Sequence, residues 1–258
     1  MLLNIKKVAF PREHGSWGFL IEPLLLSLLV AYTYNGLLLT LCTFVIFLAH
    51  QPARILLGKK DSKKLKSSAL LFFILYSIIA ILLLVVILSG TNIELLTPFL
   101  ISIVLMFGFL VLEYNNFGRN LLVEFIAPVA ITFVALNIVL FDGWTLEKII
   151  AFGFVLLSRA IPTLLYVNTK VKIIKGQSTN SLLLRISEVL FLSLIIFLAV
   201  KNSVPYLSIF AILLLIVRSI IGLLPKNKNE KVRTMGMKEF GFGILFVIIN
   251  AIGYLFDL

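Results

Sequence analysis

The run SSALLFFILYSIIAILLLVVILSGTNI, residues 67–93, contains no charged side chain and decides the class of fold. Its 27 residues exceed the roughly 20 that a helix needs to cross the hydrocarbon core of a bilayer. A second uncharged run of 31 residues lies between Glu22 and Arg54. We therefore predict membrane helices and exclude a soluble fold.

The composition of the whole chain agrees with this class. Of its 258 residues, 60% are apolar and 14% are charged, whereas soluble domains carry about 25% charged residues. The one cysteine, Cys42, lies inside an apolar run and has no partner, which excludes disulfides and cysteine metal sites. The chain is predicted to be an integral membrane protein without disulfides.

Apolar runs between charges and turn residues predict nine transmembrane helices in one all-α, polytopic bundle over residues 1–258. The expected helices lie near 15–34, 36–57, 68–89, 95–112, 121–141, 148–167, 182–200, 205–224 and 240–256. The uncharged run after Glu22 is too short for two crossings of about 20 residues each. The first helix is therefore expected to carry Glu22 into the bilayer.

The basic residues predict the orientation of this bundle. Of the 23 lysines and arginines, only Lys148 and Lys201 fall outside the group that nine crossings put on the side of the N-terminus. Cytosolic loops collect Lys and Arg, so we predict a cytosolic N-terminus and an external C-terminus in the cell membrane. The net charge of +11 then reflects topology and attraction to anionic lipid, and nucleic acid is excluded as a partner.

Ionisable residues inside membrane helices are costly and are site candidates by default. Glu22 lies about two turns into the first helix. Arg159 lies eleven residues after Lys148, or roughly 16 Å of helical rise, near the middle of the bilayer. Its expected partner is Glu22 or Glu124, because both reach inward from the cytosolic side. Most other candidates also fall in the cytosolic half, which predicts a polar cavity open to the cytosol and closed outside.

The same residues have structural interpretations that the sequence leaves open. Arg159 can form an ion pair that only holds the bundle together. Arg218 and Arg185 can extend to the lipid headgroups, and Arg185 can pair with Glu188 on one helix face. His14 can cap the first helix.

Familiar catalytic patterns are absent from the chain. It has no Gly-x-Ser-x-Gly, no His-Glu-x-x-His and no phosphate-binding Gly-Lys-Ser/Thr loop. Two histidines are too few for a histidine-rich metal centre, so no metal site is predicted.

The opening block Pro11-Arg12-Glu13-His14-Gly15-Ser16-Trp17-Gly18, with Glu22-Pro23, resembles the signature of the YwiC-like family of bacterial and archaeal membrane proteins. Similar blocks follow at 47–54 (FLAHQPAR), 118–124 (GRNLLVE) and 159–162 (RAIP), the last with Tyr166-Val167. The resemblance spans most of the chain and implies a multi-pass membrane protein without an established activity.

A second resemblance is to the UbiA superfamily of intramembrane prenyltransferases, which have nine helices and a site opening to the cytosol at helices two and six. Those enzymes bind a prenyl diphosphate through Mg²⁺ held by two Asp-rich motifs. This chain departs from that pattern, because its aspartates, Asp61, Asp142 and Asp257, are scattered and the first motif's place reads HQPAR (50–54). The resemblance thus implies an anionic lipid held without those motifs.

The leading hypothesis is a UbiA-like protein that handles an anionic, prenyl-diphosphate-like lipid in a cytosol-facing cavity. As a prenyltransferase-like enzyme it would use Glu22 or Glu124 as the base, and His14 or His50 to orient the acceptor. The anionic head would be bound by four basic residues: Arg54, Arg119, Arg159 and Lys170.

Two alternatives stay open. One is a secondary transporter built on an Arg159–carboxylate pair, and the other is a non-catalytic partner in a membrane assembly. A carboxylate near Arg159 at mid-depth favours transport, whereas a lipid-sized groove opening sideways between helices favours the lipid enzyme. Cofactor and oligomeric state are left unassigned by the sequence.

Overall fold

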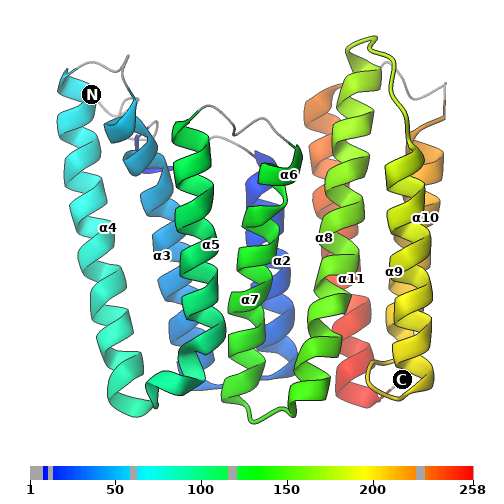
Figure 1. Cartoon of the computed structure of the whole chain (residues 1–258), viewed down its shortest axis with the longest axis horizontal. Helices are drawn as coiled ribbons and strands as arrows, with labels where there is room; N and C mark the ends of the chain where they lie inside the picture. Colours follow the sequence, from blue (N-terminus) through cyan, green and yellow to red (C-terminus); the bar gives the residue numbers. More distant parts are fainter. Residues whose placement is uncertain (1–7, 11–13, 59–62, 116–120, 225–229, 258) are drawn as a thin grey trace.

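The computed structural model describes residues 8–10, 14–58, 63–115, 121–224 and 230–257, and these contain helices and no strand. In this described part of the chain, nine helices of at least 16 residues stand side by side and run alternately up and down (Figure 1). They are α2 (His14–Val30), α3 (Tyr34–Leu57), α4 (Lys63–Gly90), α5 (Thr97–Tyr114), α7 (Ile126–Phe141), α8 (Leu146–Ile174), α9 (Leu182–Val200), α10 (Leu207–Gly222) and α11 (Val232–Phe256). Two single turns, η1 (Ile93–Leu96) and α6 (Leu121–Glu124), precede α5 and α7.

Length and composition make six of these helices able to cross a membrane: α3, α4, η1 with α5, α8, α9 and α11. Helices α2, α7 and α10 are apolar but shorter. The expected polytopic helical bundle is therefore confirmed, and the chain is a multi-pass membrane protein.

Two of the differences from the expected boundaries involve helices that contain a proline, and the proline explains the first difference. The expected helix 121–141 is divided into α6 and α7 at Phe125. Pro128 has no N–H to bond to the carbonyl of Glu124, four residues earlier, so the ladder is interrupted there. Pro162 does not end α8, which continues to Ile174 instead of ending near residue 167. A proline inside a long, packed helix costs a hydrogen bond but does not have to stop the helix.

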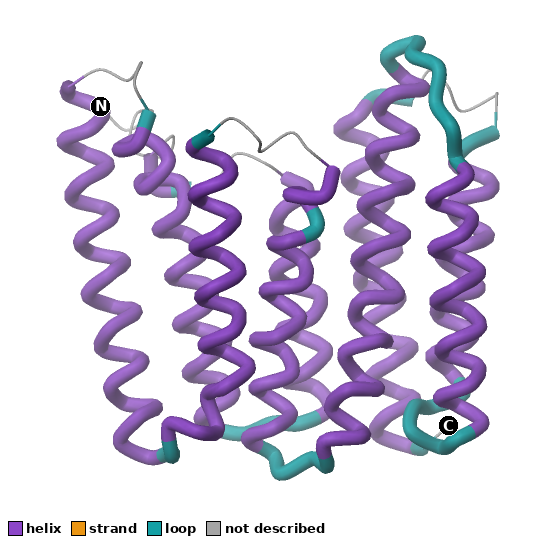
Figure 2. The backbone as a smooth tube through the Cα atoms, viewed as in Figure 1, coloured by secondary structure: helices purple, strands orange, loops and turns teal. Residues whose placement is uncertain are grey.

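The nine helices form two groups that share a central seam. Helices α2, α3, α4, α5 and α7 pack with one another around Leu20, Leu39, Cys42 and Ile138. Helices α8 to α11 pack around Phe152, Ile195 and Phe246. The groups meet where α7 contacts α8 and where α2, early in the chain, contacts α11. The tube in Figure 2 shows this arrangement without side chains.

Asn137 is a buried polar residue whose role is structural. Its Oδ1 accepts a hydrogen bond from the backbone N–H of Phe99, at 3.1 Å. Phe99 lies in the first turn of α5, where helical N–H groups have no partner within the helix. The side chain from α7 thus satisfies an N–H group that would be costly to leave unpaired in an apolar surrounding.

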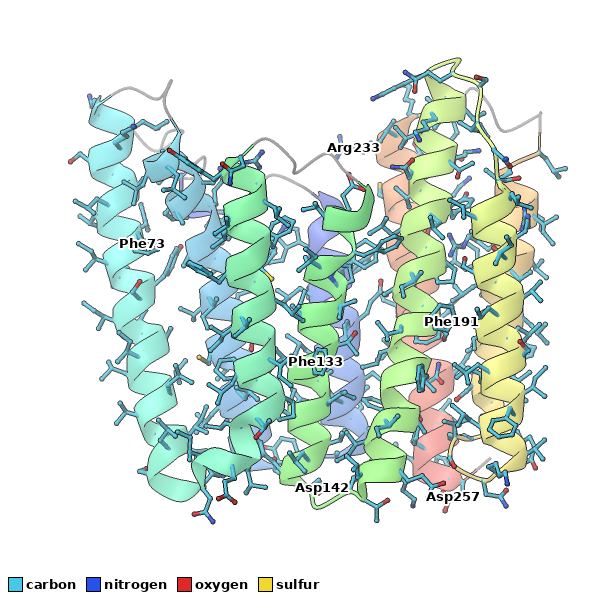
Figure 3. The ribbon with its side chains drawn as sticks, in the orientation of Figure 1. Phe73, Phe133, Asp142, Phe191, Arg233 and Asp257 are labelled. Carbon is cyan, nitrogen blue, oxygen red and sulfur yellow. The ribbon has the colours of Figure 1, made fainter. Side chains whose placement is uncertain are left out.

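The two ends of the bundle differ in charge. In Figure 3, Arg233 lies at one end, and Asp142 and Asp257 lie at the other. The end with Arg233 also carries the first turns of α4 and the last turns of α8, which bring Lys64, Lys66 and Lys172. This grouping is the one on which the predicted orientation depends, and the orientation itself stays a prediction.

Candidate functional site

Arg159 and Glu22 form a buried ion pair at mid-helix. Arg159 lies thirteen residues from the first and fifteen from the last residue of α8, and Glu22 lies eight residues from both ends of α2. The Nη2 of Arg159 donates to Glu22 Oε1 at 3.2 Å, and its Nε lies 3.0 Å from Oε2. The side chains are only 6% and 9% exposed, so the pair is shielded from both water and lipid.

A second carboxylate, Glu239 of α11, lies on the other side of Arg159. The Nη2 of Arg159 donates to the backbone carbonyl of Glu239 at 3.0 Å, and Nη1 lies 3.9 Å from Glu239 Oε2. The same Oε2 accepts a hydrogen bond from Arg218 Nη1, in α10, at 2.7 Å. Glu239 therefore joins two arginines from different helices.

Thr163 connects the same two arginines one turn after Arg159. Its Oγ1 accepts a hydrogen bond from Arg218 Nη2 at 3.1 Å and another from Arg159 Nη1. We name Glu22, Arg159, Thr163, Arg218 and Glu239 the central network. It draws on α2, α8, α10 and α11, and its two carboxylates balance its two guanidinium groups in charge.

Aromatic side chains hold Arg218 in place. Its Cζ lies 4.4 Å from the centroid of the Tyr166 ring and 5.8 Å from that of Phe242, both suitable for cation–π attraction. The Arg218 side chain is 5% exposed, and its Nε has no hydrogen-bond acceptor among the described residues. The Nε of Arg159 also has no hydrogen-bond acceptor among the described residues, so two buried N–H groups of the network are unused.

Glycine allows the Glu22 carboxylate to lie directly against α11. A Cβ atom at Gly243 would be 1.8 Å from Glu22 Oε1, far inside contact distance. A Cβ at Gly18, one turn before Glu22 on α2, would be 3.1 Å from the same oxygen. The first and last of the long helices can therefore approach closely only where α11 has no side chain.

A small cavity lies beside the ion pair. Its volume is about 20 Å³, which is enough for one water molecule. Its walls come from α2, α7, α8 and α11: Phe19, Glu22, Pro23, Pro128, Thr132, Leu156, Arg159, Ala160 and Phe246. A second cavity of about 10 Å³, between α8, α9 and α10, is bordered by Ser158, Glu188 and Arg218. Neither can hold a prenyl chain.

Two further polar groups continue from the network toward the basic end. Glu188 of α9 accepts hydrogen bonds from Ser219 and, at 2.6 Å, from Arg185. Lys170, fully buried on α8, donates to the carbonyl of Gly222 and lies 3.6 Å from Glu230. Each of these buried charges has an oppositely charged neighbour.

A separate cluster lies between α3 and α5, which we name the edge cluster: His50, Arg54 and Glu113. Glu113 Oε2 lies 3.3 Å from His50 Nε2, and its Oε1 lies 3.1 Å from Arg54 Nε. The Arg54 side chain is 52% exposed and that of Glu113 is 22% exposed. This cluster is much more open than the central network.

The structure brings together only part of the residues proposed from the sequence. Arg159 meets Glu22, whereas Glu124, the half-buried last residue of α6, is not within salt-bridge distance of Arg159. Of the four basic residues proposed for an anionic head, the three that the structure describes do not form one group. Arg54 lies on α3, which Figure 1 places across α7 from α8, the helix of Arg159 and Lys170.

The other proposed residues are placed only in part. His50 belongs to the edge cluster and contacts Glu113. His14 begins α2, but its side chain is outside the described part of the structure, and Arg119 lies outside the described residues altogether. Within the described residues no three His, Cys, Asp or Glu side chains gather in a way that could hold a metal ion.

Glu239 and Thr163 belong to the network although the sequence pattern does not single them out. Glu239 precedes the expected start of the last helix at 240, so the pattern predicts no membrane depth for it. Helix α11 in fact begins at Val232, which moves Glu239 two turns into the helix. The unpaired charge of a buried Arg218 is the signal that could have suggested a second carboxylate near it.

The YwiC-like family model matches residues 10–139, or 130 of the 258 residues. The chain belongs to the YwiC-like family. The matched part of this YwiC-like protein supplies Glu22 and the edge cluster, while Arg159, Arg218 and Glu239 lie beyond it. No curated protein and no solved structure matches the chain, so the resemblance to the UbiA superfamily is not confirmed.

Proposed function

We propose that this YwiC-like protein is a secondary transporter whose pathway passes the Glu22–Arg159 pair. The observation that carries the proposal is the central network itself: a buried set of two carboxylates and two guanidinium groups, in which Glu22 and Arg159 lie at mid-helix. Ionisable groups inside membrane helices are expensive and are usually kept for function. Binding sites of transporters commonly lie near the midplane, where separate groups of helices meet.

Residues of the network have more than one oppositely charged neighbour, and this favours a transport site rather than a single ion pair with a structural role. Arg159 contacts both Glu22 and Glu239, and Glu239 contacts both Arg159 and Arg218. Arg159 therefore has a second carboxylate within reach when its contact with Glu22 is lost, for example when Glu22 is neutralised. The prolines Pro23 and Pro162 lie beside the network in α2 and α8, where they weaken the helical ladder.

The anionic-lipid function expected from the sequence ranks second. A prenyl-lipid enzyme needs a long apolar cavity next to its charged head site, and both cavities near the network hold no more than about one water molecule. Arg54 also lies apart from Arg159 and has a carboxylate neighbour in Glu113. Lipid handling is retained as an outcome of the test below.

Cysteine accessibility tests the proposal without knowledge of the substrate. The single native cysteine, Cys42, is fully buried and can be replaced in a Cys42→Ala background. Thr132→Cys then puts one thiol on the cavity wall, and Ala135→Cys, one turn along α7 in the apolar core, is its matched control. A charged, membrane-impermeant thiol reagent is added to right-side-out and inside-out vesicles.

A transporter that alternates between two faces predicts that Thr132→Cys reacts from both sides of the membrane, while Ala135→Cys reacts from neither. Reaction from the cytosolic side alone would overturn transport in favour of a one-sided lipid cavity. Protection from both sides would overturn it in favour of a structural partner in a membrane assembly.

A further inference from the structure

We infer that Glu22 takes up the coupling proton and that Arg159 and Arg218 bind a small oxyanion that is transported with it. This inference rests on the proposed transport function and assigns its coupling ion and substrate class. Its basis is the charge balance of the central network and the way in which both arginines converge on Thr163.

The charge balance links the two ligands. With both glutamates ionised, the network is neutral, because Glu22 and Glu239 balance Arg159 and Arg218. A proton on Glu22 leaves two guanidinium groups with one carboxylate, an excess of one positive charge in a buried place. An uncompensated buried charge is strongly unfavourable, so a monovalent anion is attracted only after the proton has bound. By linkage, the anion also strengthens proton binding by the same factor.

The arginines are arranged to share one anion. Both donate to the Oγ1 of Thr163, so the two guanidinium groups face the same small volume. Planar guanidinium forks match the oxygen atoms of carboxylates and similar anions. The Nε of Arg218 is buried and has no acceptor among the described residues, and it is available to such a ligand.

A proton fits Glu22 better than a metal cation does. Hard cations need six or more oxygen ligands, and the carboxylate nearest to Glu22 in the network, Glu239, is itself bound by Arg218. The cavity beside Glu22 has room for about one water molecule, which is enough to deliver a proton.

Few other charges act on Glu22. Arg159 from α8, Glu239 from α11 and Arg218 from α10 are the charged groups that face it. Helix α7 contains no titratable residue. On α2 itself the other titratable residue is His14, whose side chain is outside the described part.

The titratable groups of the remaining neighbour, α3, are engaged elsewhere. His50 and Arg54 contact Glu113, Cys42 donates to the carbonyl of Ala80, and Tyr34 is exposed. The remaining charged residues of α11, Arg233 and Lys238, are exposed, and so is Asp257, which follows the helix. A proton at this depth therefore changes the charge of the central network and of no other cluster.

The test uses the purified full chain in lipid nanodiscs with formate and nitrate as monovalent probe anions, titrated by calorimetry from about pH 5 to about pH 8. If only the form with protonated Glu22 binds the anion, the apparent Kd rises about tenfold per pH unit above the pKa of Glu22. Glu22→Gln imitates the protonated form and should bind the anion with the same affinity at every pH. The matched control Glu113→Gln neutralises the edge cluster and should keep the wild-type pH dependence.

The binding results test the proton and the oxyanion, and they do not test transport itself. Anion binding with the same pH dependence in Glu22→Gln as in the wild type would remove the proton from Glu22. Absence of binding of either probe to both the wild type and Glu22→Gln would overturn the oxyanion class. Thiol access to Thr132→Cys from both faces would still support transport in either case, so the two failures are distinguishable.

Discussion

The central network and the edge cluster contain the same chemistry at different depths. Each has a carboxylate between two basic side chains: Glu239 between Arg159 and Arg218, and Glu113 between His50 and Arg54. In the edge cluster the Arg54 side chain is 52% exposed, whereas in the central network that of Arg159 is 6% exposed. We therefore expect the burial of a charged side chain, and not the presence of a partner alone, to determine how much its removal destabilises the protein.

The physical reason is the solvation of the charges. Exposed ion pairs contribute about 0–1 kcal/mol, because water solvates the separated charges almost as well as they solvate each other. Buried charges have lost that water, so a missing partner leaves the whole desolvation cost uncompensated. Neutralising any one charged side chain of the central network should thus destabilise the protein strongly. Neutralising one in the edge cluster should have little effect on stability.

The largest effect is expected for Arg159→Ala. It leaves Glu22 without its closest positive partner, and removal of one member of a buried pair costs about 3–5 kcal/mol. Thermal unfolding in detergent measures the loss, and Arg233→Ala, an exposed arginine of α11, is the control with a change below about 0.5 kcal/mol. Equal losses for the two variants would contradict the difference in depth.

The double variant Glu22→Leu/Arg159→Met should recover much of the stability that either single change loses. Apolar side chains of similar size can replace a buried ion pair at little cost in stability. A double-mutant cycle should give a coupling energy of about 0.5–3 kcal/mol. The double variant should nevertheless lose anion binding completely. Stability and binding restored together would mean that the pair is not part of the site.

A smaller loss is expected for Gly243→Ala. The added methyl group would collide with the Glu22 carboxylate and displace it, at about 1–3 kcal/mol for an overpacked site. Gly241→Ala, two residues earlier on the same helix, has open space around it. That variant should be neutral or more stable by up to about 1 kcal/mol, since alanine favours helix. Comparison of the two melting temperatures separates the steric effect from helix propensity.

The smallest effect is expected for Glu113→Gln in the edge cluster. A half-exposed pair contributes up to about 1 kcal/mol, and salt screens it, because the Debye length falls from about 10 Å at 0.1 M to about 3 Å at 1 M. The difference in melting temperature from the wild type should shrink at high salt. A difference that is large and independent of salt would show that the edge cluster is as critical as the central network.

The sequence predicts the helices well. Of the central network it predicts the pair of Glu22 and Arg159 but not Glu239. Long uncharged runs have no structure other than a membrane helix available to them, and a mid-helix Arg159 requires a carboxylate nearby. Glu22 could be proposed because it stands inside an apolar helix. Glu239 could not, because it ends the polar stretch 225–239, outside the apolar run expected to span the membrane, and only the packing of α11 against α2 brings it into the bundle. Of the two expected partners of Arg159, the structure shows Glu22, while Glu124 ends α6, which the break at Phe125 separates from α7.

The separation of Glu22 and Arg159 along the chain has a consequence for biosynthesis. The two residues are 137 positions apart, and Glu239 comes later still. During translation, α2 emerges with its carboxylate long before α8 or α11 exists to neutralise it. A helix of only 17 residues with an acidic centre is a weak substrate for membrane insertion. The nascent chain therefore has to hold α2 in a temporary position at the translocon or at the lipid surface until the second half of the bundle has been made.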